Sequence, residues 1–138
     1  MIVNCVYGDI LESNHDKIIF ATNSQGINTC GFAGLVAARY WPELANIGQF
    51  ELGDILTANI KDRTFYAIVC HELDKYGWIN AGTFIKEALD SIYLPSHQVM
   101  GMVMAGTGPI GVAQGADAWD ILSGIAQSNK LVEVYKLK

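Results

Sequence analysis

Short apolar runs and helical patterns alternate along the chain. The strands expected at 55–60 and 64–70 are separated only by residues 61–63, which is short enough for a hairpin. Strands that alternate with helices predict an α/β fold of three layers around a mixed central sheet. Apolar, β-branched runs ending at polar or glycine turns predict strands at 2–7, 18–21, 55–60, 64–70, 99–104 and 131–137, and apolar residues at helical spacing predict helices at 33–40, 81–93 and 117–127.

Length and composition indicate one globular domain. The chain has 138 residues, of which 51% are hydrophobic and 17% charged, so residues 1–138 suffice for a single core. No apolar run approaches the roughly 18 residues that span a bilayer, and the first residues lack the pattern of a signal peptide. Cys5, Cys30 and Cys70 include no C-x-x-C pair, which favours a reducing, cytoplasmic compartment without a disulfide framework or a metal site.

The net charge of −5 argues against one class of partner. An acidic chain has no broad electrostatic footprint for a nucleic-acid duplex. An anionic small molecule stays compatible with this charge, because backbone N–H groups and helix ends bind anions without lysine or arginine. We expect no cofactor and no membrane partner.

Two glycine-containing turns follow apolar strands and open helices. Gly106, Gly108 and Gly111 follow the strand at 99–104, and a second turn at 26–34 follows the strand at 18–21. Glycine lets the backbone approach a ligand closely and lets successive N–H groups converge on an anion. The two turns therefore predict a diphosphate held between them, although a plain strand-to-helix connection also uses glycine.

Three segments in register make the chain resemble a macro domain, the ADP-ribose-binding module. These are Gly-Asp-Ile at 8–10, Ala-Thr-Asn at 21–23 with Cys-Gly-Phe-Ala-Gly at 30–34, and Ala-Gly-Thr-Gly-Pro-Ile-Gly-Val at 105–112. The final helix and strand are similar to those of the small ADP-ribose phosphate phosphatases and terminal ADP-ribose protein glycohydrolases. The resemblance implies a partner that is ADP-ribose, a related small nucleotide or an ADP-ribosylated protein.

The resemblance also implies residue roles. Asp9 would accept a hydrogen bond from the adenine amino group, and the Ile10 N–H would donate to the ring. Asn23 would bind the distal ribose. The alternative interpretation is that Asp9 and Asn23 only stabilise turns, where both residue types are common. The residues expected to wrap the diphosphate and distal ribose are Cys30, Gly31, Phe32, Ala33, Gly34, Gly106, Thr107, Gly108, Pro109, Ile110, Gly111 and Val112.

No complete catalytic set follows from the resemblance. Where the glycohydrolases have a lysine nucleophile, this chain has Cys70 and His71, with Lys75 further on. Cys70, His71 and Asp117 are the candidate catalytic residues. The simpler interpretations are a solvated loop pair for His71 and Glu72, and a helix-start charge for Asp117.

The remaining aromatic residues have structural interpretations. Trp41, Trp78 and Trp119 are expected to fill the core, with base stacking as an alternative for Trp78. His15 and His97 lie in polar stretches and are expected to be exposed.

Three functional hypotheses follow from the residues and the resemblance. The first is a binding module, a reader or sink of free or protein-linked ADP-ribose. The second is a hydrolase that removes phosphate or ADP-ribosyl groups at the distal ribose, which needs an activated water or a nucleophile at the reacting atom. The third is an unrelated α/β nucleotide or flavin binder.

Overall fold

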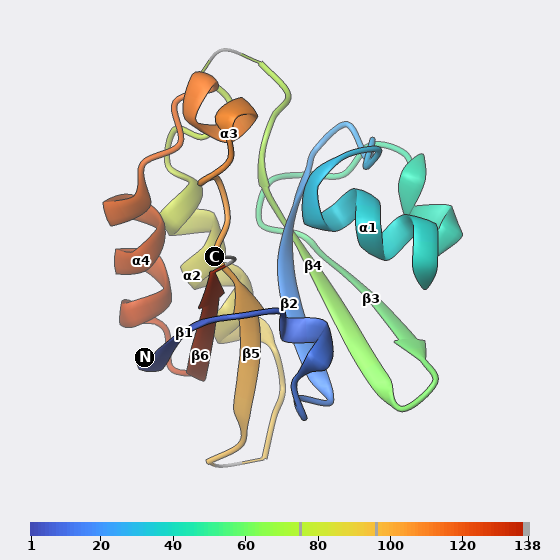
Figure 1. Ribbon diagram of the computed structural model, residues 1–138. Helices are drawn as coiled ribbons and strands as arrows, with labels where there is room; N and C mark the ends of the chain where they lie inside the picture. The colour runs from blue at the N-terminus through green and yellow to red at the C-terminus, as the bar shows by residue number, and fades with distance from the viewer. Residues whose placement is uncertain (75, 96, 137–138) are drawn as a thin grey trace.

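The computed structural model describes residues 1–74, 76–95 and 97–136 and contains one six-stranded sheet (Figure 1). The strand order is β1-β6-β5-β2-β4-β3, with β3 antiparallel to β4 and every other pair parallel. The mixed sheet expected from the sequence is confirmed. The strands are β1 (Ile2–Tyr7), β2 (Lys17–Asn23), β3 (Ile55–Ile60), β4 (Arg63–His71), β5 (Val99–Val103) and β6 (Leu131–Lys136).

Helices cover both faces of the sheet (Figure 1). Ile85 and Leu89 of α2 and Ile121 and Ile125 of α4 are fully buried against one face. On the other face α1 and η2 pack with β2, β3 and β4, which completes the three layers. The helices and 3-10 turns are η1 (Ile10–Glu12), α1 (Gly31–Arg39), η2 (Pro42–Ala45), α2 (Ala81–Ser91), α3 (Pro109–Ala113) and α4 (Ala118–Gln127).

Two glycines bring α2 and α4 into backbone contact. A Cβ atom built on Gly124 would lie 2.1 Å from the Gly82 carbonyl oxygen. The Gly82 N–H donates to Oδ2 of Asp120 at 3.0 Å. Any side chain at Gly124 would therefore force the two helices apart, since no real contact is that short.

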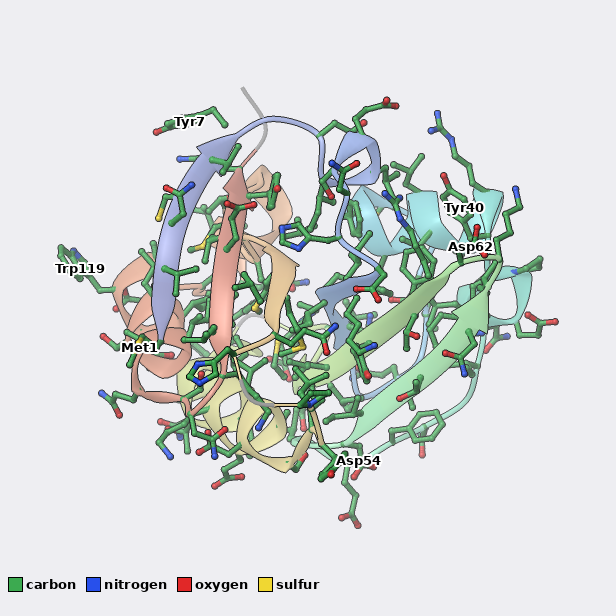
Figure 2. All side chains as sticks on the ribbon, turned by 90° about the horizontal axis from the view of Figure 1, so that it is seen from below. Met1, Tyr7, Tyr40, Asp54, Asp62 and Trp119 are labelled. Carbon is green, nitrogen blue, oxygen red and sulfur yellow. The ribbon has the colours of Figure 1, made fainter. Side chains whose placement is uncertain are left out.

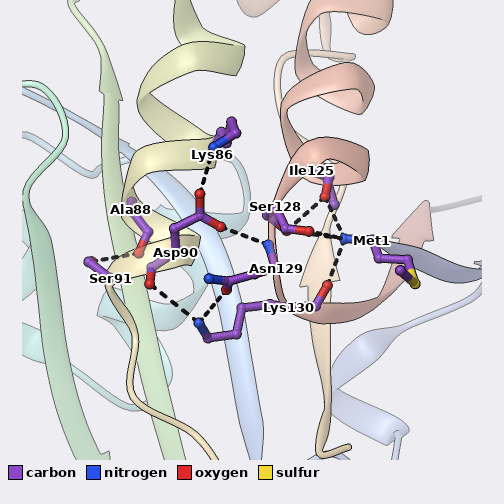
Figure 3. Close-up of polar contacts among 9 residues, drawn as sticks. All are labelled: Met1, Lys86, Ala88, Asp90, Ser91, Ile125, Ser128, Asn129 and Lys130. Carbon is purple, nitrogen blue, oxygen red and sulfur yellow. Dashed lines mark hydrogen bonds and ion pairs between the residues drawn. The ribbon is translucent and has the colours of Figure 1, made fainter.

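The amino terminus is tied to the end of α4 (Figure 3). The Met1 ammonium group donates to the carbonyl oxygens of Ile125, Ser128 and Lys130 at 2.8, 3.0 and 2.6 Å. These carbonyl groups belong to the last turn of α4 and to the segment that follows it. The contacts anchor the start of β1 beside β6.

Asp90 at the end of α2 joins the same region (Figure 3). One carboxylate oxygen accepts from the Asn129 N–H at 2.7 Å, and the other accepts from Lys86 Nζ at 2.7 Å. The carboxylate therefore links α2 to the turn between α4 and β6.

Several side chains lie elsewhere than the sequence indicated. The prediction that Trp119 fills the core is wrong: its side chain is 81% exposed and projects outward (Figure 2). Trp119 is two positions before Ile121, which places it about 200° around the helix from the buried face. His15 was expected to be exposed, but it is partly buried: its ring packs against Tyr135, and Nε2 hydrogen-bonds to Glu133 Oε1 at 2.8 Å.

None of the helices in the described ranges is both long and apolar enough to cross a bilayer.

Candidate functional site

A cavity of about 620 Å³ opens at the carboxyl ends of β2, β4, β5 and β6. This volume is in the range of small-molecule sites, about 300–1,000 Å³. Its walls come from segments far apart in the sequence. The lining residues are 20–23, 27–33, 71, 73, 78, 103–108, 111, 114 and 135–136.

The cavity forms where the connections of neighbouring strands diverge. From β2 the chain passes to α1 on one face of the sheet, and from the adjacent β5 it passes through α3 to α4 on the other face. The two connections leave a crevice at this switch point, where open α/β sheets bind their ligands.

The turn after β2 is held by side-chain amides. Asn23 Oδ1 accepts from the Ile27 N–H at 3.2 Å, and its Nδ2 donates to the Ile27 carbonyl at 2.8 Å. Thr22 Oγ1 donates to Asn28 Oδ1 at 2.7 Å, and Asn28 Nδ2 donates to the Leu44 carbonyl at 2.9 Å. Asn23 lines the cavity and also shapes the turn itself, and its contact with a distal ribose stays a prediction.

The start of α1 presents backbone donors to the cavity. The N-cap residue Cys30 makes no side-chain capping bond, and no acceptor in the described part of the chain takes the N–H groups of Gly31, Phe32 or Ala33. Gly31 has φ +65°, which favours glycine. The Phe32 ring packs 5.6 Å from that of Phe20, so its bulk turns toward the core. A helix start with unpaired donors suits an anion.

The glycines after β5 differ in what they require. Gly106 has φ +72°, and a Cβ atom there would meet Ala116 Cβ at 2.7 Å. A Cβ atom on Gly111 would lie 2.7 Å from Gly106 Cα. At Gly108, which lines the cavity, an added Cβ would meet none of the described atoms within 4 Å. Gly108 therefore leaves open space that a ligand could occupy.

Some of the predicted ligand residues lie outside the cavity wall. Asp9 caps η1, where Oδ1 accepts from the Leu11 N–H at 2.9 Å, and Ile10 is buried. Gly34 packs against the Thr29 backbone, where an added Cβ would lie 2.8 Å from its carbonyl carbon. Their ligand roles stay predictions. Val112 also lies outside the cavity wall. The side chains of Pro109 and Ile110, and the whole of residue Lys75, fall outside the described part of the chain.

One of the three candidate catalytic residues lines the cavity. Cys70 is fully buried in the core, and burial raises the pKa of its thiol. Asp117 caps α4 by accepting from the Trp119 N–H at 2.9 Å. His71 ends β4 and faces the cavity.

His71 is a buried ring in a stack. Its imidazole lies on the indole of Trp78, with ring centres 3.9 Å apart and planes 10° from parallel. The expectation that His71 and Glu72 form a solvated loop pair is wrong for His71, which is 8% exposed. Burial lowers its pKa to about 4, although the contact of Nδ1 with the Glu72 carbonyl opposes this shift. His71 is therefore neutral at pH 7.

Trp78 fills the core as expected, but its indole nitrogen is unusual. Nε1 is buried and has no hydrogen-bond partner within the described residues. An unpaired buried donor costs about 1–3 kcal/mol. The indole is kept in place despite this cost, between the core and the cavity wall.

The end of β6 supplies wall residues that sequence reasoning missed. The Tyr135 hydroxyl donates to Glu133, and the His15 ring meets the tyrosine ring edge-on at 5.6 Å. Burial, and then the bond to Glu133, raise the pKa of Tyr135. Tyr135 and Lys136 were identifiable as ligand candidates by their place at the end of a parallel strand. The other cavity-lining residues outside the predicted set include Ile27, Asn28, Thr29, Leu73 and Gln114.

The cavity wall carries little charge. The chain has 14 acidic residues, and none of them is among the described residues that line the cavity. Lys136 is the basic residue of this described wall. The described part of the wall therefore presents N–H donors and no carboxylate, in a protein whose net charge is −5.

No family model and no curated protein sequence matches this chain. Solved structures do match. The macrodomain of Mycobacterium tuberculosis DarG aligns with a TM-score of 0.72 and 14% identity, over 98% of this chain and 97% of that chain. The chain has the macrodomain fold.

Two further solved structures with this fold were determined with nucleotides. Thermosipho africanus DarTG in complex with ADP-ribose has a TM-score of 0.69 and 13% identity, over 97% of this chain and 42% of that chain. The Trypanosoma brucei macrodomain in complex with ADP has a TM-score of 0.61 and 13% identity, over 94% and 61%. This chain thus spans less than two thirds of either of these two proteins.

Proposed function

We propose that this macrodomain binds ADP-ribose or a closely related nucleotide, as a reader or sink of free or protein-linked ADP-ribose. The observation that carries the proposal is a single cavity lined both by the uncapped start of α1 and by the glycine turn after β5. A diphosphate between them would meet N–H donors from both sides. The neighbours solved with ADP-ribose and with ADP support this choice of ligand.

The strand order suggests how the ligand lies. Strands are about 4.8 Å apart, so the cavity extends about 14 Å from β6 to β4. A diphosphate over the central β5 and β2 leaves one end of the ligand over β6 and the other over β4. The adenine then lies on the side of Tyr135 and the expected reader Asp9, and the distal ribose lies beside Asn23 and His71.

Calorimetry with ADP-ribose, ADP, AMP, NAD and flavin mononucleotide tests the proposal. We expect ADP-ribose to bind most tightly. A preference for flavin mononucleotide would instead favour the unrelated flavin binder.

Gly108→Glu tests the glycine turn. The position has room for a side chain, so the protein should stay folded, while the new carboxylate repels the diphosphate and abolishes binding. Ala113→Glu adds the same charge outside the cavity wall and should leave the affinity within about twofold. Unchanged ADP-ribose affinity in a folded Gly108→Glu protein would contradict the site.

A hydrolase acting at the distal ribose is the second candidate, and the position of His71 in the cavity favours it. Incubation with ADP-ribose phosphate and with an ADP-ribosylated protein, followed by product analysis, separates turnover from binding. Turnover that persists in His71→Phe would remove this residue from the mechanism. A cytoplasmic reader and a hydrolase would both bind ADP-ribose in the same cavity. Only the formation of product distinguishes the two functions.

A further inference from the structure

The stacked pair His71 and Trp78 lines the β4 end of the cavity. Trp78 belongs to the core cluster under α2 and α4, and its Cζ3 atom would lie 3.4 Å from a Cβ atom on Gly106. The indole is therefore fixed between the core and the turn after β5. Because the imidazole lies flat on this fixed ring, His71 has little freedom to reorient.

The hydrogen bonding of His71 leaves one nitrogen for a ligand. Nδ1 lies 3.4 Å from the Glu72 carbonyl oxygen, which only accepts, so Nδ1 carries the proton of a neutral ring. Nε2 is then an acceptor. It has no partner within the described residues, and His71 lines the cavity.

The charges around this end are unfavourable for an anion. Glu72 follows His71 directly, and Asp74 is close by in the same turn; both are exposed. Lys136 lies at the opposite, β6 end of the cavity wall. A terminal phosphate beside His71 would meet a neutral acceptor and nearby carboxylates, whereas a sugar hydroxyl would donate to Nε2.

We propose that His71, held by Trp78, is a specificity-determining residue that accepts a hydrogen bond from a hydroxyl group of the distal sugar and selects a ligand ending in an uncharged ribose over one ending in a phosphate. The inference rests on the proposed binding of ADP-ribose. It assigns His71 a direct ligand contact and Trp78 the role of a positioning residue.

His71→Phe tests the contact, because phenylalanine keeps a flat ring on Trp78 and removes the Nε2 acceptor. Calorimetry compares ADP-ribose, ADP-ribose 1″-phosphate and ADP, which lacks the distal sugar. In the wild type we expect ADP-ribose to bind at least about tenfold more tightly than its phosphate. In His71→Phe we expect ADP-ribose to lose about tenfold in affinity, while ADP affinity stays the same.

His97→Phe is the matched control, since His97 is exposed and outside the cavity wall. It should bind all three ligands as the wild type does. Equal losses for ADP and ADP-ribose in a folded His71→Phe protein, no loss for either, or equal wild-type affinities for ADP-ribose and its phosphate would each overturn the inference. Wild-type protein that binds no ADP-ribose would instead overturn the proposed function, and this inference with it.

Trp78→Phe separates positioning from contact. It keeps an aromatic ring under His71 and should retain ADP-ribose affinity within about threefold, with the preference over the phosphate unchanged. Trp78→Ala removes the support and should reduce that preference. A folded Trp78→Ala protein with the wild-type preference would refute the positioning role.

Discussion

Burial keeps His71 uncharged and thereby makes the free energy of unfolding depend on pH. In the unfolded chain a histidine binds a proton near pH 6.5, whereas the folded-state pKa is lowered to about 4. Between these values the unfolded state binds more protons than the folded state. The free energy of unfolding therefore falls as the pH decreases from 6.5 to 4 and is at its full value above 6.5.

We expect this residue alone to remove about 2–3 kcal/mol of stability between pH 7 and pH 4. Urea unfolding of the wild type and His71→Phe at both pH values measures it, because the variant keeps every other titrating group. From pH 7 to pH 4, the free energy of unfolding should therefore fall more in the wild type than in His71→Phe, and the extra loss should equal that amount. The same difference at both pH values would contradict a neutral, buried His71.

Single glycines show how far residue-level prediction extends. The sequence indicated that Gly106, Gly108 and Gly111 form one phosphate-binding motif. In the structure Gly106 and Gly111 pack so closely that Gly111 has no room for a side chain, whereas Gly108 faces open space. Glycine at all three positions is equally visible in the sequence, but the steric reason for each depends on neighbours that only the folded turn brings together.

At the scale of elements, long periodic segments were predictable and short ones were not. The apolar spacing of α2 and α4 identified both helices and their buried faces. α3 has five residues, fewer than two turns, so it shows no helical periodicity. His71 was assigned to a loop because the strand prediction ended with the apolar run, one residue before β4 ends.

The contact between α2 and α4 supports a prediction at this scale. Gly124→Ala places a methyl group against the Gly82 backbone, and Ser123→Ala is the matched control one position earlier. We expect the glycine substitution to cost about 1–3 kcal/mol, since overpacking against backbone leaves no rotamer to adjust. The control should change stability by less than about 1 kcal/mol. Thermal or urea unfolding measures both, and equal effects would contradict the close crossing.

At the scale of the whole molecule, the alternation of strands and helices was enough to predict three layers and a mixed sheet. The strand order was not predictable, because pairing between β1 and β6 joins the two ends of the chain. Tyr135 was left out of the predicted site for the same reason, whereas for Trp78 the sequence analysis gave base stacking only as the alternative to filling the core. Residues of the second and third loop motifs line the cavity, those of the first do not, and only the topology defines the two ends of the cavity.

The charge of the whole molecule supports a last prediction. Binding through backbone N–H groups acts at contact distance and is little affected by salt, whereas the net charge of −5 repels a diphosphate from farther away. Because salt screens mainly the long-range repulsion, ADP-ribose affinity measured by calorimetry should stay constant or rise up to about threefold from 20 to 200 mM NaCl. Lys136→Gln should make this rise steeper, because it removes the basic side chain of the described cavity wall. A tenfold loss of wild-type affinity over this range would mean that basic side chains, and not backbone donors, hold the diphosphate.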